Sequence, residues 1–291
     1  ATAADLGAVE SGAFDVLAAF AHQVAFVDEP EGDSASLVLA PVEVAVQDRF
    51  GNLVPGASPE VALSLAESTN AASLDGTTSV TAAAGVARFT ALELRLAGTY
   101  RLAASAAGLA GARSDTFSIV PALPNRLAVL AGPGQGEGQE PLAPALQVGL
   151  VDRFGNVNPA GSVTVSVTLA GGNPDAVLSG TTSRSTVSGV ATFDDLVVDR
   201  AGGDYVLLAD AIGGFQAQGS APFDVRLTFD DIAVGFSHSC GLTVAGHAYC
   251  WGRNNRGQLG DGTQVSRSLP TPVDTGIRFE DLAAGETHTC G

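Results

Sequence analysis

The sequence predicts an all-β protein assembled from repeated units, and three observations lead to that prediction. A stretch at 229–241, FDDIAVGFSHSCG, returns at 279–291 as FEDLAAGETHTCG. A longer set of landmarks in the first half of the chain returns about 104 residues later. The composition is rich in alanine, glycine, valine and threonine, and few windows carry the helical spacing of apolar residues. Repeats at fixed spacing indicate supersecondary units that recur along the chain.

The overall charge and hydrophobicity of the chain exclude two kinds of partner. The chain has 291 residues, a formal net charge of -17 and 14 basic residues, all of them arginine. Because so acidic a surface repels a phosphate backbone, we expect no nucleic-acid partner. No apolar run approaches the roughly 18 residues of a membrane helix, so we expect no membrane insertion within this segment.

Residues 1–20 are expected to be the C-terminal strand of a preceding domain. SGAFDV at 11–16 parallels SAPFDV at 220–225, which belongs to the end of a later unit. The chain starts at Ala1 without a leader of the signal-peptide type. We therefore expect a sequence that starts inside a longer one.

Residues 21–122 and 123–226 are expected to be two copies of one domain. DRFGN at 48–52 returns at 152–156, and the motifs GTTS and GVA-x-F return at the same spacing. Each copy contains short segments in which apolar and polar residues alternate, as in VEVAVQ, separated by turn signals such as FGN, PG and DG. About seven short strands per hundred residues predict an immunoglobulin-like β-sandwich in each copy.

A tyrosine follows a turn and begins a strand in both copies, as AGTYRL and GGDYVL. Tyr100 and Tyr205 therefore stand where a tyrosine corner would lie, a feature in which the hydroxyl bonds the backbone a few residues upstream. The cysteine pair that links the sheets of antibody domains is missing from both copies. We expect packing alone to hold the two sheets together.

The two DRFGN segments form the first candidate site. Asp and Asn side chains commonly hydrogen-bond the backbone of their own turn, and glycine supplies a positive φ. A structural turn is therefore expected, with calcium binding as the alternative because such loops offer carboxylate oxygens. The residues concerned are Asp48, Gly51, Asn52, Asp152, Gly155 and Asn156.

The order of these motifs resembles a known family. D-x-x-G-N, G-T-T, G-V-A-x-F and G-x-Y-x-L-x-A follow one another as in the bacterial Ig-like repeats of group 1 (Big-1), the type found in invasins and intimins. The resemblance covers roughly residues 21–226. It implies stacked sandwiches on a bacterial surface protein.

Residues 227–278 are expected to form one blade of a β-propeller, and residues 279–291 the first strand of the next blade. CGLTVAGHAYCW at 240–251 indicates two short strands joined by a turn in which a glycine permits a positive φ. The glycines of GQLGDG permit tight reversals, and Leu259 can fill the space between blades. Such a meander is the unit from which propellers close a ring of roughly 4 to 8 blades.

The same segment resembles the regulator-of-chromosome-condensation repeat. The match consists of G-x-x-H-x-C-G-L and Y-C-W-G-x-N-x-x-G-Q-L-G-D-G, and it covers residues 227–291. Because one blade cannot close a ring, we expect these residues to be marginally stable in isolation. The blade motif consists of His238, Trp251, Gly252, Gly257, Gln258, Leu259 and Gly260.

All three cysteines lie in this last part of the chain. Cys240 and Cys250 face each other across the proposed hairpin, and a disulfide between them is expected, which would indicate an oxidising compartment. Two buried thiols, or a metal site completed by His238, are the alternatives. Cys290 repeats the position of Cys240, so we expect its partner about ten residues further along, beyond Gly291.

No set of residues assembles a catalytic site, and we expect no enzyme activity, no cofactor and no metal. His238 and His288 share one repeat position, which indicates a structural hydrogen bond. GFSHS at 235–239 falls short of the G-x-S-x-G motif of serine hydrolases. The glycine cluster at 132–138 lacks the lysine of a phosphate-binding loop and is expected to be an ordinary loop. The acidic pair at 194–195 is expected on a strand, pointing to opposite faces into solvent.

These inferences predict a non-enzymatic fragment of a bacterial protein that is secreted or exposed at the cell surface. The sandwiches would form a stalk, and the propeller would bind a protein or carbohydrate through its loops. An accessory region of an extracellular polysaccharide-active enzyme is one alternative. Guanine-nucleotide exchange, the activity of eukaryotic relatives of the propeller, is the other and the less favoured, because the cysteines indicate an extracellular location.

Overall fold

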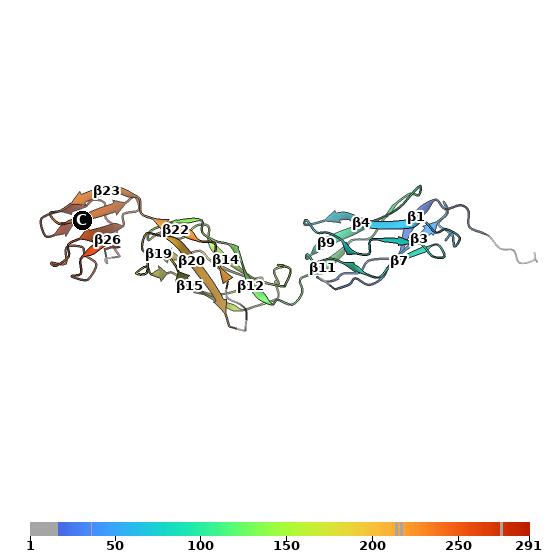
Figure 1. Ribbon diagram of the computed structural model, residues 1–291, viewed down its shortest axis with the longest axis horizontal. Coiled ribbons are helices and arrows are strands. Elements are labelled where there is room, and N and C mark those ends of the chain that lie inside the picture. The colour runs from blue at the N-terminus through green and yellow to red at the C-terminus, as the bar shows by residue number, and fades with distance from the viewer. Residues whose placement is uncertain (1–16, 36, 213–214, 216–217, 274–275) are drawn as a thin grey trace, which may run out of the picture. The chain divides into compact units, whose positions relative to one another are not determined.

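The computed structural model describes residues 17–291 except residues 36, 213–214, 216–217 and 274–275 (Figure 1). Strands and turns account for this part of the chain, which has no helix, and the all-β class is confirmed. No helix long and apolar enough to span a membrane occurs among these residues. The strand expected within residues 1–20 lies mostly outside the described residues. The chain divides into two compact units, Ala1–Ala122 and Leu123–Gly291.

Unit 1 is an immunoglobulin-like sandwich of two sheets. The smaller sheet has the order β1-β3-β7, and the larger has the order β2-β11-β9-β4-β6, with β10 on β9 and a separate β5-β8 pair. Figure 1 labels β1, β3 and β7 of the smaller sheet and β4, β9 and β11 of the larger. The β2 strand pairs in parallel with β11. The strands are β1 (Gln23–Asp28), β2 (Asp33–Ser34), β3 (Val42–Gln47), β4 (Glu60–Ser68), β5 (Asp75–Gly76), β6 (Ser79–Thr81), β7 (Val86–Phe89), β8 (Leu92–Glu93), β9 (Gly98–Ala106), β10 (Ala112–Arg113) and β11 (Phe117–Val120).

The first part of unit 2 repeats this sandwich strand by strand. Its sheets have the orders β12-β14-β18 and β13-β22-β20-β15-β17, with β21 on β20 and a separate β16-β19 pair. The strands are β12 (Arg126–Ala131), β13 (Gln135–Glu137), β14 (Leu146–Val151), β15 (Thr164–Ala170), β16 (Leu178–Ser179), β17 (Ser183–Ser185), β18 (Val190–Phe193), β19 (Val197–Val198), β20 (Gly202–Ala211), β21 (Gln218–Gly219) and β22 (Phe223–Arg226).

The cores follow from the alternation of the strands. Val44 and Leu102 of unit 1 and Val148 and Leu207 of unit 2 are completely buried between the sheets. Burying each such side chain contributes about 1.5 to 3 kcal/mol. With no disulfide among the described residues of either sandwich, this apolar packing is the main cohesive force between the sheets.

Both tyrosine corners are confirmed. The Tyr100 hydroxyl donates a hydrogen bond of 2.7 Å to the carbonyl of Leu96, and the Tyr205 hydroxyl donates one of 3.1 Å to the carbonyl of Arg200. Both rings are buried, and each packs at an angle on the phenylalanine that opens the last strand of its sandwich. The repeat in sequence is therefore a repeat of tertiary contacts.

Two local expectations were wrong. The glycine cluster at 132–138 is not simply a loop, because Gln135–Glu137 form β13 and pair in parallel with β22. A Cβ on Gly136 would lie 2.6 Å from a methyl group of Leu142 and 3.3 Å from one of Val225 on β22, so the glycine lets β13 lie close to both side chains. The acidic pair at 194–195 lies in a loop after β18 and not on a strand, although both side chains are exposed to solvent as expected; Arg184 bridges the two carboxylates, at 2.7 and 3.0 Å.

The rest of unit 2 is one propeller-type blade and the beginning of a second. Four antiparallel strands with the order β23-β24-β25-β26 form the first blade, and β27 pairs with β28 in the second. The strands are β23 (Phe229–Val234), β24 (His238–Thr243), β25 (Ala248–Gly252), β26 (Arg267–Pro272), β27 (Ala283–Ala284) and β28 (Thr289–Cys290).

Candidate functional site

The β24–β25 hairpin carries the disulfide that the sequence predicts. Cys240 and Cys250 are direct cross-strand partners, with an S–S distance of 2.07 Å, and both are buried. Because the disulfide engages both sulfurs, the two alternatives, free thiols and a metal site with His238, are excluded. Cys290 is an exposed free thiol on β28.

His238, the histidine of the blade motif, reaches from the first blade to the second. Its Nε2 lies 2.9 Å from the Thr289 hydroxyl, and the side chain is buried. The Thr289 hydroxyl also donates a hydrogen bond of 3.0 Å to the carbonyl of Gln258. The histidine therefore has a structural role, because its hydrogen bond joins the first blade to the second.

Burial lowers the pKa of His238, and the neighbouring charge of His288 lowers it further. The Nδ1 atom of His238 is buried and has no hydrogen-bond partner among the described residues. A second proton on the ring would therefore be buried without an acceptor. The geometry favours a neutral imidazole with its proton on Nε2, donated to Thr289.

The loop between β25 and β26 is organised around Asn254, the asparagine of the Y-C-W-G-x-N-x-x-G motif. Asn254 is completely buried, and its Nδ2 donates to Asp261 (2.9 Å) and to the carbonyl of Val265 (3.1 Å). Its Oδ1 accepts from the backbone N–H of Leu259 at 2.9 Å. The motif marks the position of this asparagine, but it did not predict the hydrogen bonds that the side chain makes.

Asp261 closes the same loop. Its carboxylate lies 3.0 Å from the Nε of Arg267 and accepts a hydrogen bond of 2.8 Å from the Thr263 hydroxyl. Burial raises the pKa of Asp261, but the hydrogen bonds from Thr263, Arg267 and Asn254 outweigh burial and hold that pKa below its ordinary value. The carboxylate is thus a charged structural group, engaged within the blade.

The remaining motif residues shape the blade. Trp251 stacks on Phe229 with ring centroids 5.8 Å apart. Gly252 has a φ of 108°, and a Cβ there would lie 2.6 Å from the carbonyl oxygen of Ser237, so only glycine fits. Gly257 and Gly260 also have positive φ, at the reversals the sequence predicts.

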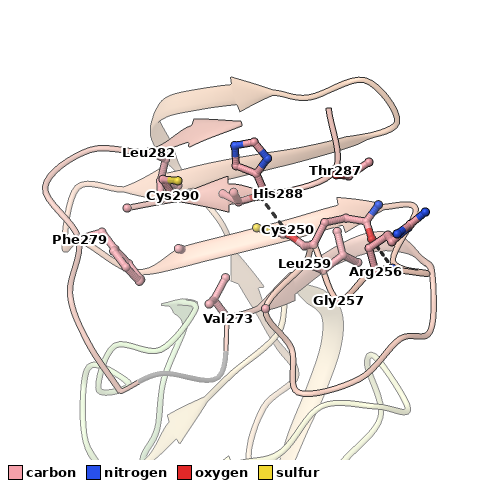
Figure 2. Close-up of a pocket in the computed structure, with 15 residues that line it drawn as sticks. Cys250, Arg256, Gly257, Leu259, Val273, Phe279, Leu282, Thr287, His288 and Cys290 are labelled. Atoms are coloured by element: carbon pink, nitrogen blue, oxygen red, sulfur yellow. Dashed lines mark hydrogen bonds between the residues drawn. The ribbon is translucent and has the colours of Figure 1, made fainter. Parts of the chain in front are cut away.

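A groove lies between the first blade and the start of the second (Figure 2). Its volume is about 310 Å³, and Leu259 from the first blade and Leu282 from the second belong to one apolar cluster there. Figure 2 shows His288 and Cys290 along the side of the second blade, with Phe279 at one end. Leu259 is buried and lines this groove on the side of the first blade.

The DRFGN turns are built alike in both sandwiches. The Asp48 carboxylate accepts from the N–H of Phe50 (2.8 Å) and from the backbone and side-chain N–H groups of Asn52. It also accepts from the N–H of Ala19 at 3.0 Å. The hydrogen bond from the Asn52 side chain has the largest effect on the pKa of Asp48; burial opposes it, and the backbone hydrogen bonds add to it, so that the pKa lies well below its usual range.

Asp152 repeats the pattern, accepting from the N–H groups of Phe154 (2.8 Å) and Asn156 (3.0 Å). Gly51 and Gly155 have φ values of 85° and 91° in the two turns. These contacts describe a structural turn whose carboxylate oxygens face protein donors. No group of three or more His, Cys, Asp or Glu side chains suited to a metal ion occurs within the described ranges.

Two family models match the end of the chain. Both describe the regulator of chromosome condensation (RCC1) repeat, one over residues 245–291 and the other over residues 229–258. Together they extend from the start of β23 to Gly291. The C-terminal segment is therefore RCC1-type repeat sequence, in agreement with the blade that it forms.

The solved structures that the chain resembles are similar to it only at low sequence identity and low TM-score. A glycosyl hydrolase family 2 member from Bacteroides cellulosilyticus is 14% identical, covers 64% of this chain and 23% of its own, and has a TM-score of 0.32. A β-glucuronidase of glycoside hydrolase family 2 is 13% identical, with coverages of 72% and 20% and a TM-score of 0.32. β-Glucuronidase 3 of Bacteroides uniformis is 16% identical, with coverages of 68% and 24% and a TM-score of 0.28. The chain spans about a quarter or less of these enzymes, and likeness at this level carries no argument about activity.

Proposed function

We propose that this chain is a non-enzymatic part of a secreted or surface-exposed bacterial protein, in which sandwiches of the group 1 Ig-like type support an RCC1-type propeller that binds a partner. The observation that carries the proposal is the buried Cys240–Cys250 disulfide inside the RCC1-type repeat. Disulfides form and persist in oxidising compartments, which supports a location outside the cytosol.

The engagement of the polar groups in the blade supports binding over catalysis. His238, the histidine of the blade motif, is buried and hydrogen-bonded to Thr289. Asp261 is engaged by Arg267 and Thr263. A general base must reach a substrate proton, and neither group is free to do so.

We expect the groove between the blades to be filled by protein rather than by the partner. Phe279 lies one repeat after Phe229, which packs on Tyr249 and Trp251 of β25. The repeat therefore predicts that Phe279 packs on the aromatic residues of a strand equivalent to β25, with a cysteine opposite Cys290. The partner would then bind through the loops of the blades.

The location is tested by producing the chain in the cytosol and in the periplasm of a bacterial host. We expect peptide mapping without reductant to find Cys240 linked to Cys250 in the periplasmic product. Two free thiols at these positions in the periplasmic product would contradict the proposed location.

The binding role is tested with immobilised glycans, immobilised cell-surface proteins and insoluble polysaccharides. We expect saturable binding to a glycan or a protein and no release of new reducing ends from any polysaccharide. Release of reducing ends would overturn the non-enzymatic assignment. Binding to insoluble polysaccharide without binding to the other probes would favour the accessory region of a polysaccharide-active enzyme instead.

A further inference from the structure

Within unit 2, the second sandwich and the first blade share a contact surface centred on Tyr249. This side chain is completely buried, and its hydroxyl donates a hydrogen bond of 3.1 Å to the carbonyl of Asp199 in the sandwich. Burial raises the pKa of Tyr249. A buried tyrosine with its hydroxyl satisfied by the other domain contributes both apolar area and a directional bond.

Charged groups surround this tyrosine on both sides of the contact. Glu140 of the sandwich lies 3.0 Å from the Nε2 of His247, in the turn between β24 and β25, and 3.2 Å from an Nη atom of Arg278, which follows β26. On the other flank, Arg200 of the sandwich donates a hydrogen bond of 3.2 Å to the hydroxyl of Thr271 on β26. His247, Arg278 and Thr271 thus join the blade to the sandwich at points on either side of Tyr249.

Gly138 of the second sandwich packs directly against the Tyr249 side chain, and no space remains there for a Cβ atom. A Cβ on Gly138 would lie 2.6 Å from the Tyr249 hydroxyl and 2.6 Å from a methyl group of Leu227. The backbone of Gly138 is in an ordinary conformation, so its lack of a side chain serves this close approach and not a turn.

The first sandwich shows that these features are not general to the fold. The N–H of Ala35 bonds the carbonyl of Val120 as the N–H of Gly138 bonds that of Arg226. Leu37 bonds back to Ser34 as Glu140 bonds back to Glu137. At two of the positions that touch the blade, the first sandwich therefore has Ala35 and Leu37 in place of Gly138 and Glu140.

We propose that Gly138, Glu140, Asp199 and Arg200 form a dedicated seat for the first blade. The seat fixes the blade on the second sandwich as one rigid body and supplies stability that a single blade lacks. This inference goes beyond the proposed function, because it holds whatever the propeller binds. Its consequence is that the propeller has a fixed orientation on its adjoining sandwich.

The decisive variant is Gly138→Ala in the full chain. It gives the second sandwich the alanine that the first sandwich has at the corresponding position, Ala35. The matched control is Gly134→Ala, because a Cβ on Gly134 meets no atom within 4 Å. Native-state hydrogen exchange of β24 and β25 is compared with that of β20. We expect exchange in the blade to become about tenfold faster in Gly138→Ala and to stay unchanged in the control. Unchanged blade exchange in Gly138→Ala overturns the proposal.

A second pair keeps the test decisive where Gly138→Ala fails to fold. Glu140→Gln removes the charge that His247 and Arg278 share, and Glu43→Gln removes the charge that pairs with Arg88 at 3.0 Å in the first sandwich. We expect about twofold to fivefold faster blade exchange in Glu140→Gln alone. Equal blade exchange in both variants overturns the proposal.

Rigidity is measured separately in the unaltered chain by NMR relaxation. We expect the amides of β20 and β24 to report one rotational correlation time and one diffusion tensor. Two different tensors would mean that the blade moves on its sandwich, and the seat would be wrong.

Discussion

The state of one imidazole ring determines how the blade responds to acid. The Thr289 hydroxyl donates to the carbonyl of Gln258, so it receives the Nε2 proton of His238, and Nδ1 stays unprotonated in a buried position. Burial first, and the charge of His288 second, lower the pKa of His238 below the ordinary histidine value of 6.5. In the unfolded chain the ring has an ordinary environment and binds a proton more readily.

We therefore predict that the blade loses stability as the pH falls through 6.5, because the unfolded state then binds more protons than the folded state. The contribution is fully present above that pH. Urea unfolding followed by the fluorescence of Trp251, the single tryptophan of the chain, reports the blade at each pH. In His238→Gln, which keeps a donor toward Thr289, this part of the pH dependence should disappear. His22→Gln, at an exposed position in the first sandwich, is the control, and an identical pH profile in both variants would contradict the assignment.

Loops are the elements that hold the blade in shape, and Asn254 is the residue on which the β25–β26 loop depends. Asn254→Ala would leave the N–H of Leu259 and the carbonyls of Thr263 and Val265 without their partner. Leaving such groups unpaired costs about 2 to 3 kcal/mol in the free energy of unfolding. The Trp251 unfolding midpoint should fall accordingly, while Asn255→Ala, an exposed neighbour, should leave it unchanged. A midpoint equal to that of the unaltered chain would show that the loop is not needed.

Elements that repeat in sequence could be predicted, and elements that depend on distant contacts could not. The DRFGN turns, the tyrosine corners and the Cys240–Cys250 pair each follow from local residue types at a repeated spacing. The β13 strand could not be predicted from its glycines, because its partner β22 lies about ninety residues away. Glu140 and His247 meet across 107 residues, and no periodic pattern connects them.

At the scale of the whole molecule, the two sandwiches share one topology but differ in the residues at the end where the second sandwich contacts the blade. Their strand orders correspond one to one, and their cores use corresponding residues, such as Leu102 and Leu207, both completely buried. The differences at Gly138 and Glu140 make the second sandwich a partner of the blade. The fold is thus repeated, and substitution at one end of a single copy provides the specific contact with the blade.

This difference predicts that the same core substitution has different consequences in the two sandwiches. Leu102→Ala and Leu207→Ala should each destabilise their own sandwich by about 2 to 5 kcal/mol, because each removes a buried side chain and leaves a cavity. Circular dichroism in urea reports both losses. The Trp251 midpoint should fall only in Leu207→Ala, because the blade rests on the second sandwich through Tyr249 and Glu140. A Trp251 midpoint that both variants leave unchanged would mean that the blade folds without its sandwich, and that the contacts at Tyr249 join two bodies already stable by themselves.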